Sequence, residues 1–333
     1  MPPGALEAEQ AAVLESKPVQ AVAKKQKDTG LWGNNLLGLE PDADAGIKDV
    51  GTIPQYRRLL QLGVPAGARP LRLADRVLYR VLSRDEDPAL YFEWTKTLKA
   101  APALRDYARG VMREAVSAAL AEAGHLDDPR VRGAGHKIAD QVSAFLRGPI
   151  VESPFVKAGR GLALHPEAHP PSWYSVAMIA AMPNLRRERA GFAERLGHYL
   201  AQPAPKKSFV IQIEGEAMAP SHLLLGDPIE VDAKSCPKDI PLALHYIELL
   251  ARMGALQWAP VASRALARLL KDCDEQGVWH PKGIRSWPSA HDPFTYHAYP
   301  LQQDDKKSES KLVDVTFRLA LIAKLLGWDL EYV

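Results

Sequence analysis

The chain has 333 residues, and 47% of them are apolar, which is enough for a sizeable core in one large or two ordinary domains. Its 42 basic and 40 acidic side chains leave a net charge of +2, so overall charge gives no argument for a nucleic-acid or membrane partner. Two cysteines exclude a disulfide framework.

Nothing in the sequence indicates export or membrane insertion. The first residues, Met-Pro-Pro-Gly-Ala-Leu-Glu, lack the basic and apolar regions of a secretory signal. No run approaches the roughly 18 apolar residues that a membrane span needs. We therefore expect a cytoplasmic protein with reduced thiols and no transmembrane segment.

Nearly every periodic segment is typical of a helix. Good helix formers fill 5–26, and the four glycines of 33–51 predict a connecting loop. Thr52 and Pro54 are typical of a helix start. Further helices are predicted over 70–84, 88–99, 102–123, 129–147, 172–182, 186–201, 239–254, 260–273 and 311–328.

The segments between these helices have three different characters. Prolines and glycines predict a loop over 157–171, and we expect 1–7 and 304–310 to be flexible. The alternating, β-branched stretch 208–214 predicts a strand, for which 227–232 is the candidate partner. The sequence therefore predicts one small β-hairpin within 208–232 of an otherwise helical chain.

One short phrase occurs twice, each time after a predicted helix. Residues 26–32 read Gln-Lys-Asp-Thr-Gly-Leu-Trp, and residues 273–279 read Cys-Asp-Glu-Gln-Gly-Val-Trp. Repeated units of this kind are supersecondary elements that need neighbours to bury their apolar faces. Antiparallel helix pairs joined in this way stack either into a closed ring or into an open superhelix.

The first copy resembles the QW repeat of the terpenoid cyclase and protein prenyltransferase superfamily, through Gln26, Gly30 and Trp32. The second copy keeps the glycine and the tryptophan but has Cys273 in place of the glutamine. This resemblance implies an all-α fold, an α/α toroid of antiparallel helix hairpins that forms a single domain over 1–333. An open α-helical repeat solenoid is the alternative.

The chemical motifs of that superfamily are missing from this chain. There is no Asp-x-Asp-Asp run, and the sequence from Asp304 onward, Asp-Asp-Lys-Lys-Ser, lacks the third carboxylate of the magnesium-binding motif. Aspartates flank Cys273 directly, which is the wrong register for the family's zinc ligands. We therefore predict no metal site. The cofactor, the oligomeric state and the question of enzymatic activity stay open.

The loop after the second copy, 279–300, concentrates aromatic and histidine side chains. Aromatic walls with a few convergent polar groups are typical of pockets for apolar or sugar-like ligands. The candidate catalytic residues are His280, Arg285, His291, Asp292 and His297, and the candidate ligand-binding residues are Trp279, Trp287, Phe294, Tyr296 and Tyr299. The alternative is that this loop fills the centre of a helical ring without binding anything.

A second candidate surface is basic. Arginines recur every three or four residues along the predicted helix 70–84, at positions Arg69, Arg72, Arg76, Arg80 and Arg84. Guanidinium groups match phosphate oxygens, so Arg72, Arg76 and Arg80 are candidate ligands for a diphosphate or a nucleic-acid backbone. The alternative is a solvated helix face that Asp75, Asp85 and Asp87 partly neutralise.

Two main functional hypotheses follow. The first is a prenyltransferase-like or terpenoid-cyclase-like protein, an enzyme or a binder of a hydrophobic, isoprenoid-like small molecule in a central cavity. The second is a non-enzymatic helical-repeat scaffold that binds a protein or a nucleic acid. A toroid that degrades polysaccharides is a third, weaker reading.

Overall fold

The computed structural model describes residues 3–38, 51–84, 87–95, 102–281 and 308–329. The protein is 57% helical, and it also contains a four-stranded mixed sheet. The prediction of an all-α toroid is therefore wrong. The sequence predicted β3 but not the other three strands, because they have only three or four residues each, and the pairing of β2 with β3 joins segments that are distant in the chain.

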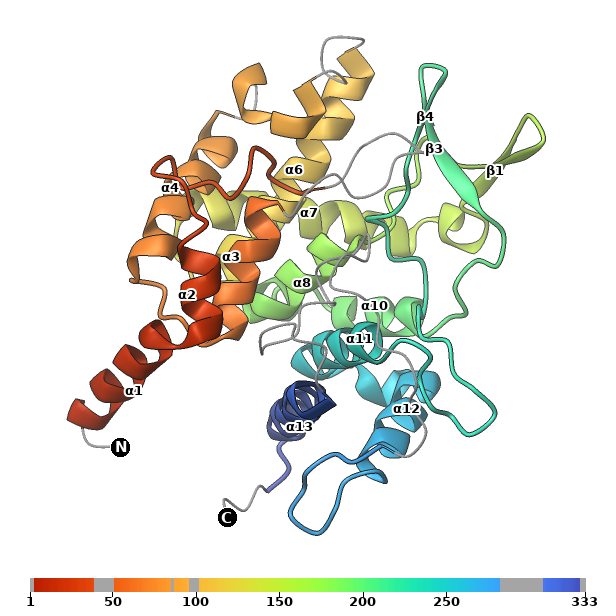
Figure 1. The fold of residues 1–333 in the computed structure, drawn as a ribbon. Coiled ribbons are helices and arrows are strands. Elements are labelled where there is room, and N and C mark those ends of the chain that lie inside the picture. Colours follow the sequence, from red (N-terminus) through yellow and green to blue (C-terminus); the bar gives the residue numbers. More distant parts are fainter. Residues whose placement is uncertain (1–2, 39–50, 85–86, 96–101, 282–307, 330–333) are drawn as a thin grey trace. The chain divides into compact units, whose positions relative to one another are not determined.

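The helices and strands are distributed along the whole chain, as Figure 1 shows. The α-helices are α1 (Pro3–Glu15), α2 (Lys17–Ala23), α3 (Thr52–Gln61), α4 (Arg69–Ser83), α6 (Pro102–Glu122), α7 (Pro129–Arg147), α8 (Trp173–Ala181), α9 (Pro183–Arg187), α10 (Phe192–Leu200), α11 (Ile240–Met253), α12 (Pro260–Leu270) and α13 (Ser308–Leu325). Short 3-10 helices are η1 (Pro88–Leu90), η2 (Phe92–Trp94), η3 (Pro149–Glu152) and η4 (Leu256–Trp258), and the strands are β1 (Phe155–Ala158), β2 (Gly161–Leu164), β3 (Phe209–Ile213) and β4 (Glu216–Met218).

Most of the predicted helices are present near their predicted bounds. The helix expected over 5–26 is instead two helices, because the chain leaves the helical conformation at Ser16 and Pro18 stands in the first turn of α2. Proline is tolerated in a first turn and breaks a helix interior. Of the segments expected to be flexible, 3–7 begin α1 and 308–310 begin α13.

The sheet has the strand order β1-β2-β3-β4. β1 and β2 are antiparallel, and β3 and β4 are antiparallel, whereas β2 and β3 are parallel with Leu162 opposite Phe209. The rings of Phe155 and Phe209 lie 4.9 Å apart. Because a parallel pair needs a long connection, the helices α8 to α10 separate β2 from β3 in the chain.

Two tight turns form strand pairs that differ from those predicted. Glu214 and Gly215 both have a positive φ, as a type I′ hairpin requires, and they turn β3 back into β4. The predicted partner of this strand, 227–232, is wrong, since it forms only isolated bridges. The predicted loop 157–171 is also wrong over β1 and β2, where Gly159 with φ 58° opens the turn.

The contacts of the chain divide it into two compact units. Unit 1 comprises Met1–Ala139, Phe155–Pro166 and Phe209–Ser221, and it contains the sheet. Unit 2 comprises Asp140–Pro154, Glu167–Ser208 and His222–Val333. The single domain expected over 1–333 stays a prediction.

Helix α4 packs against α3 and α6 in the core of unit 1. Tyr56, Leu59, Leu71 and Leu78 are fully buried between these helices. At one edge, Arg57 of α3 donates two hydrogen bonds to the carboxylate of Glu122 at the end of α6, one of them from Nη2 to Oε1 at 2.6 Å. These contacts fix the position of α4 within unit 1.

Unit 2 is built around α11, which contacts α8, α12 and α13. Tyr246 of α11 is fully buried, and its hydroxyl donates to the Leu200 carbonyl at 2.6 Å. The ring of Trp173 in α8 lies edge-on to that of Tyr246, with 6.1 Å between the centroids. Along the described part of the chain, no helix is both long and apolar enough to cross a membrane.

The two Gly-x-Trp phrases have the same local structure. Each closes on itself through an antiparallel bridge between its first and last residue, Gln26 to Trp32 in one copy and Cys273 to Trp279 in the other. The glycine of each copy has a positive φ. Only the first copy begins with a glutamine, Gln26, whose Nε2 donates to the Pro70 carbonyl at 2.7 Å and so ties the segment after α2 to the start of α4.

Candidate functional site

The arginine stripe of α4 is exposed to solvent. The apolar face of this helix buries Leu71, Ala74, Val77, Leu78 and Val81, which orients the opposite face outward. The stripe consists of Arg69, Arg72, Arg76, Arg80 and Arg84, all five of them exposed. The arginines therefore share one solvent-facing side of one helix, as expected, and their role as ligands stays a prediction.

Most guanidinium groups of the stripe have no ion-pair partner within the described residues. Arg69 lies 3.9 Å from Asp28, and both side chains are largely exposed. The other four arginines make no ion pair with any residue that the structure describes. Asp75, which we considered as a neutralising partner, is buried, and Asp87 accepts a hydrogen bond from the Ala89 N–H at 2.9 Å. Asp85 lies outside the described residues.

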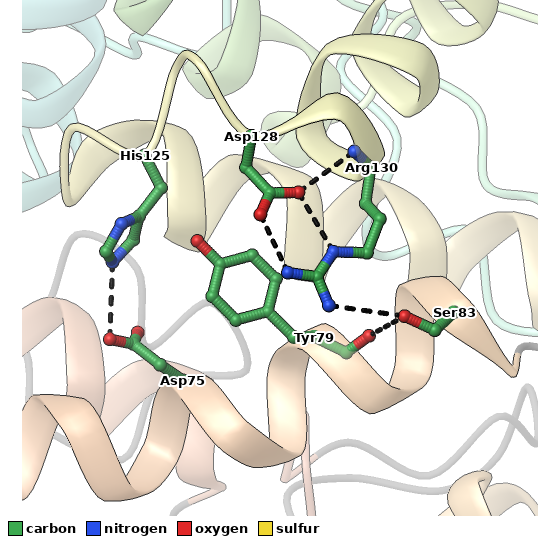
Figure 2. Close-up of polar contacts among 6 residues, drawn as sticks. All are labelled: Asp75, Tyr79, Ser83, His125, Asp128 and Arg130. Carbon is green, nitrogen blue, oxygen red and sulfur yellow. Dashed lines mark hydrogen bonds and ion pairs between the residues drawn. The ribbon is translucent and has the colours of Figure 1, made fainter.

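Asp75 instead belongs to a polar cluster that α4 forms with the turn after α6 (Figure 2). The Tyr56 hydroxyl donates to Asp75 Oδ1 at 2.6 Å. His125 Nε2 lies 3.3 Å from Asp75 Oδ2. Burial raises the pKa of Asp75, and the contacts with Tyr56 and His125 oppose this rise because they stabilise the carboxylate. The tyrosine and the histidine therefore hold this buried carboxylate between them.

The end of α6 places His125. Gly124 has a φ of 86°, and the His125 N–H donates back to the Leu120 carbonyl at 3.0 Å, as in a glycine-terminated helix. This turn brings the imidazole to α4, where it meets the ring of Tyr79 edge-on at 5.6 Å between centroids. The position of the histidine is therefore set by backbone geometry and by the two α4 side chains.

On the other side of Tyr79, Arg130 covers the ring, with Cζ 4.0 Å from the centroid. Arg130 also donates to both oxygens of Asp128, from Nη2 to Oδ2 at 2.7 Å and from Nε to Oδ1 at 2.9 Å. These hydrogen bonds lower the pKa of Asp128 and raise that of Arg130. Arg130 Nη1 lies 3.4 Å from the Ser83 hydroxyl, which itself donates to the Tyr79 carbonyl at 2.8 Å.

The Tyr79 hydroxyl stays protonated at neutral pH. Burial, followed by the charges of Asp128 and Asp75, raises the pKa of Tyr79 to about 12, and Arg130 only partly opposes this. The side chain is half-buried, and its hydroxyl makes no hydrogen bond within the residues that the structure describes. Figure 2 shows this hydroxyl on the side of the ring that faces His125. It is therefore available as a donor to a ligand.

The sequence analysis did not predict this cluster, although the half of it that lies on α4 has a recognisable spacing. Asp75, Tyr79 and Ser83 each follow an arginine of the stripe by three residues, which makes them its neighbours on the helix surface. The other half comes from the turn between α6 and α7, and no local pattern indicates that this turn reaches α4.

The predicted loop site lies almost entirely outside the described residues. This applies to Arg285, Trp287, His291, Asp292, Phe294, Tyr296, His297 and Tyr299. His280 is described, and its Nε2 lies 2.9 Å from Asp274 Oδ2 at an exposed position. Trp279 is buried, with 1% of its surface exposed. The catalytic and ligand-binding roles given to this loop stay predictions.

No group of metal-binding side chains is present in the described ranges. A recess of about 190 Å3 in unit 1, which includes open solvent, is lined by Val81, Leu90, Tyr91, Arg109 and Met112. Pockets for small molecules usually enclose roughly 300–1,000 Å3, so this recess does not support a ligand of that size. No family model, curated protein or solved structure matches the chain.

Proposed function

We propose that unit 1 binds the phosphate backbone of a single-stranded nucleic acid through the arginine stripe. The observation that carries this proposal is that four exposed arginines on one helix face have no ion-pair partner within the described residues. Unpaired guanidinium groups form bidentate hydrogen bonds with phosphate oxygens and release the counterions of a polyanion.

The length of the stripe favours a polymer over a small ligand. From Arg72 to Arg84 the helix rises by about 18 Å, because each residue advances the axis by about 1.5 Å. A diphosphate is much shorter than this and would contact only one or two of the arginines. A nucleic-acid strand presents one phosphate per roughly 3.4 Å of its axis, so it supplies an anion for every arginine.

The expected recognition is independent of sequence. Contacts to phosphates position a nucleic acid and carry no base information. A nucleotide base cannot stack freely on one face of the Tyr79 ring, because Arg130 already lies over that face. We therefore expect similar affinities for oligonucleotides of different sequence, and a strong dependence on ionic strength.

The hypothesis of an isoprenoid ligand depends on the loop 279–300, most of which lies outside the described residues, so it stays a prediction. The cytoplasmic location expected from the sequence also stays a prediction, and it is compatible with an RNA partner.

The test is fluorescence anisotropy with a labelled single-stranded oligonucleotide at low ionic strength. Arg72→Gln, Arg76→Gln and Arg80→Gln in combination are expected to weaken binding roughly tenfold or more, because three counterion-releasing contacts are lost. The matched control combines Arg187→Gln, Lys271→Gln and Lys324→Gln, which remove the same charge from exposed positions of unit 2.

Three results would contradict the proposal. The first is that the wild-type protein does not bind the oligonucleotide, and the second is that both triple variants bind as tightly as the wild type. The third is that poly-glutamate displaces the oligonucleotide at equal charge concentration. This result would indicate an acidic polypeptide as the partner, because a flexible chain of carboxylates would then satisfy the stripe equally well.

A further inference from the structure

The geometry of the polar cluster points to a chemical activity beside the arginine stripe. We propose that His125 is a general base that cleaves a bound RNA strand, with Tyr79 as the proton donor to the leaving oxygen. This inference rests on the proposed nucleic-acid binding and adds a reaction to it. RNA carries its own nucleophile, the 2′-hydroxyl next to each phosphodiester, so the protein needs only to hold the strand and move protons.

The His125 ring has one nitrogen against Asp75 and the other available for proton transfer. Its Nε2 atom is buried against Asp75 at 3.3 Å, while 27% of the side chain remains exposed. We assign the ring proton to Nε2, because this nitrogen faces the Asp75 carboxylate, which attracts an N–H group and repels a lone pair. The other nitrogen, Nδ1, then carries a lone pair and can accept a proton from a substrate.

Asp75 is a positioning residue in this arrangement. The Tyr56 hydroxyl fixes one of its oxygens at 2.6 Å, which leaves the other oxygen to orient the imidazole. In the catalytic triad of hydrolases, a buried carboxylate likewise holds the histidine in one tautomer and stabilises the imidazolium. The serine of such a triad has no counterpart in the proposed reaction. Here the nucleophile belongs to the substrate.

Three further side chains, Tyr79, Arg72 and Arg76, complete the site. The Tyr79 hydroxyl is protonated, has no partner within the described residues and lies on the side of its ring that faces His125 (Figure 2). Arg72 and Arg76 of the stripe precede Asp75 and Tyr79 by three residues, so they are neighbours of the cluster on the surface of α4. They are placed to hold the phosphate whose negative charge increases in the transition state.

The reaction balances without a co-reactant. His125 Nδ1 takes the proton of the 2′-hydroxyl, and the 2′-oxygen attacks the adjacent phosphorus. The bond from phosphorus to the 5′-oxygen of the next nucleotide breaks, and the Tyr79 hydroxyl protonates that oxygen. The imidazolium then returns a proton to the phenolate through water. The products are a 2′,3′-cyclic phosphate and a 5′-hydroxyl end, and both side chains regain their starting states.

The experiment uses a labelled DNA oligonucleotide that contains one ribonucleotide, and the same oligonucleotide without it. The wild-type protein is expected to cut only the first, after the ribonucleotide, and mass spectrometry should find the cyclic phosphate. His125→Gln should lower the cleavage rate roughly 100-fold, a typical loss for a missing general base, and Tyr79→Phe should lower it too. The control is His198→Gln, at an exposed histidine of α10.

Binding of the all-DNA oligonucleotide is measured on every preparation, so that a misfolded variant is recognised. Asp75→Asn should retain binding and change the dependence of the cleavage rate on pH, which a purely structural role would leave unmoved. If the wild type binds but never cuts, or if His125→Gln cuts as fast as the wild type, the cleavage proposal is overturned while binding stands. If the wild type does not bind the all-DNA strand, the proposed function itself fails.

Discussion

Trp32 and Trp279, near opposite ends of the chain, have the same backbone environment but different indole environments. The backbone N–H of each donates to a threonine hydroxyl, Thr52 at 3.1 Å in one case and Thr316 at 3.0 Å in the other. The indole Nε1 of Trp32 donates to the Val22 carbonyl at 2.8 Å. Within the described residues, the buried Nε1 of Trp279 has no acceptor. The repeated phrase therefore conserves its backbone geometry and loses one side-chain hydrogen bond in the second copy.

This difference predicts unequal costs for the same substitution. Trp32→Phe removes the buried indole hydrogen bond to the Val22 carbonyl, whereas Trp279→Phe removes a donor that has no acceptor within the described residues. We expect Trp32→Phe to lower the free energy of unfolding by about 1–2 kcal/mol more than Trp279→Phe. Urea unfolding followed by circular dichroism measures both, and an equal or larger loss for Trp279→Phe would show that the two indoles are equivalent.

Glu93 stabilises the chain segment that follows the first Gly-x-Trp phrase. Its carboxylate accepts three backbone hydrogen bonds, from Leu36 at 2.8 Å, Leu37 at 2.5 Å and Gly38 at 2.9 Å. Burial raises the pKa of Glu93, and these hydrogen bonds oppose the rise.

Glu93→Gln replaces one acceptor oxygen with an amide that repels a backbone N–H. We expect it to lower the free energy of unfolding by about 2 kcal/mol, since hydrogen bonds to a charged acceptor contribute about 1.5–3 kcal/mol. The matched control, Glu275→Gln, lies at an exposed loop position and should change stability very little. Thermal unfolding of both variants provides the comparison, and equal melting temperatures would refute the structural role of Glu93.

Asp227 makes the stability of unit 2 depend on pH. The residue is 8% exposed, and its Oδ1 accepts a hydrogen bond from the Ile229 N–H at 2.8 Å. Its Oδ2 atom has no hydrogen-bond partner in the described structure. Burial raises the pKa of Asp227 from 3.8 to about 6, partly opposed by the Ile229 N–H and the charge of Arg264.

The raised pKa means that the fold prefers the neutral carboxyl. The cost of ionising it is absent below the unfolded pKa near 3.8, grows between there and about 6, and is fully present above. Asp227→Asn keeps the Oδ1 acceptor and should raise the free energy of unfolding at pH 7.5 by up to about 3 kcal/mol. The gain should vanish at pH 4. Unfolding curves at both pH values test this, and a gain independent of pH would mean that ionisation is not its cause.

Local patterns predicted the helices well and the sheet poorly. The apolar face of α4 identified both the helix and its exposed arginines, because all of these residues are close in sequence. The pairing of Leu162 with Phe209 joins residues that are far apart in the chain, and strands of four or five residues carry almost no periodic signal.

In the candidate site, too, residues close in sequence were predicted and contacts between distant segments were not. The stripe of Arg72, Arg76 and Arg80 was predicted, whereas the contact between Asp75 and His125 was not, since it joins α4 to a turn that follows α6. The helix-capping geometry of Gly124 is readable in the sequence, but the element that the turn meets is a property of the packed unit.

The central claim, that the arginine stripe binds phosphates, is tested most directly by the dependence of oligonucleotide affinity on salt. For single strands, the slope of log K against log salt is about −0.7 for each phosphate contact, so four unpaired arginines predict a slope near −3. The variant with Arg72, Arg76 and Arg80 changed to glutamine should have a slope smaller in magnitude by about 2. The control variant of unit 2 should keep the wild-type slope. A wild-type slope near zero, or an identical slope in the stripe variant, would contradict the account.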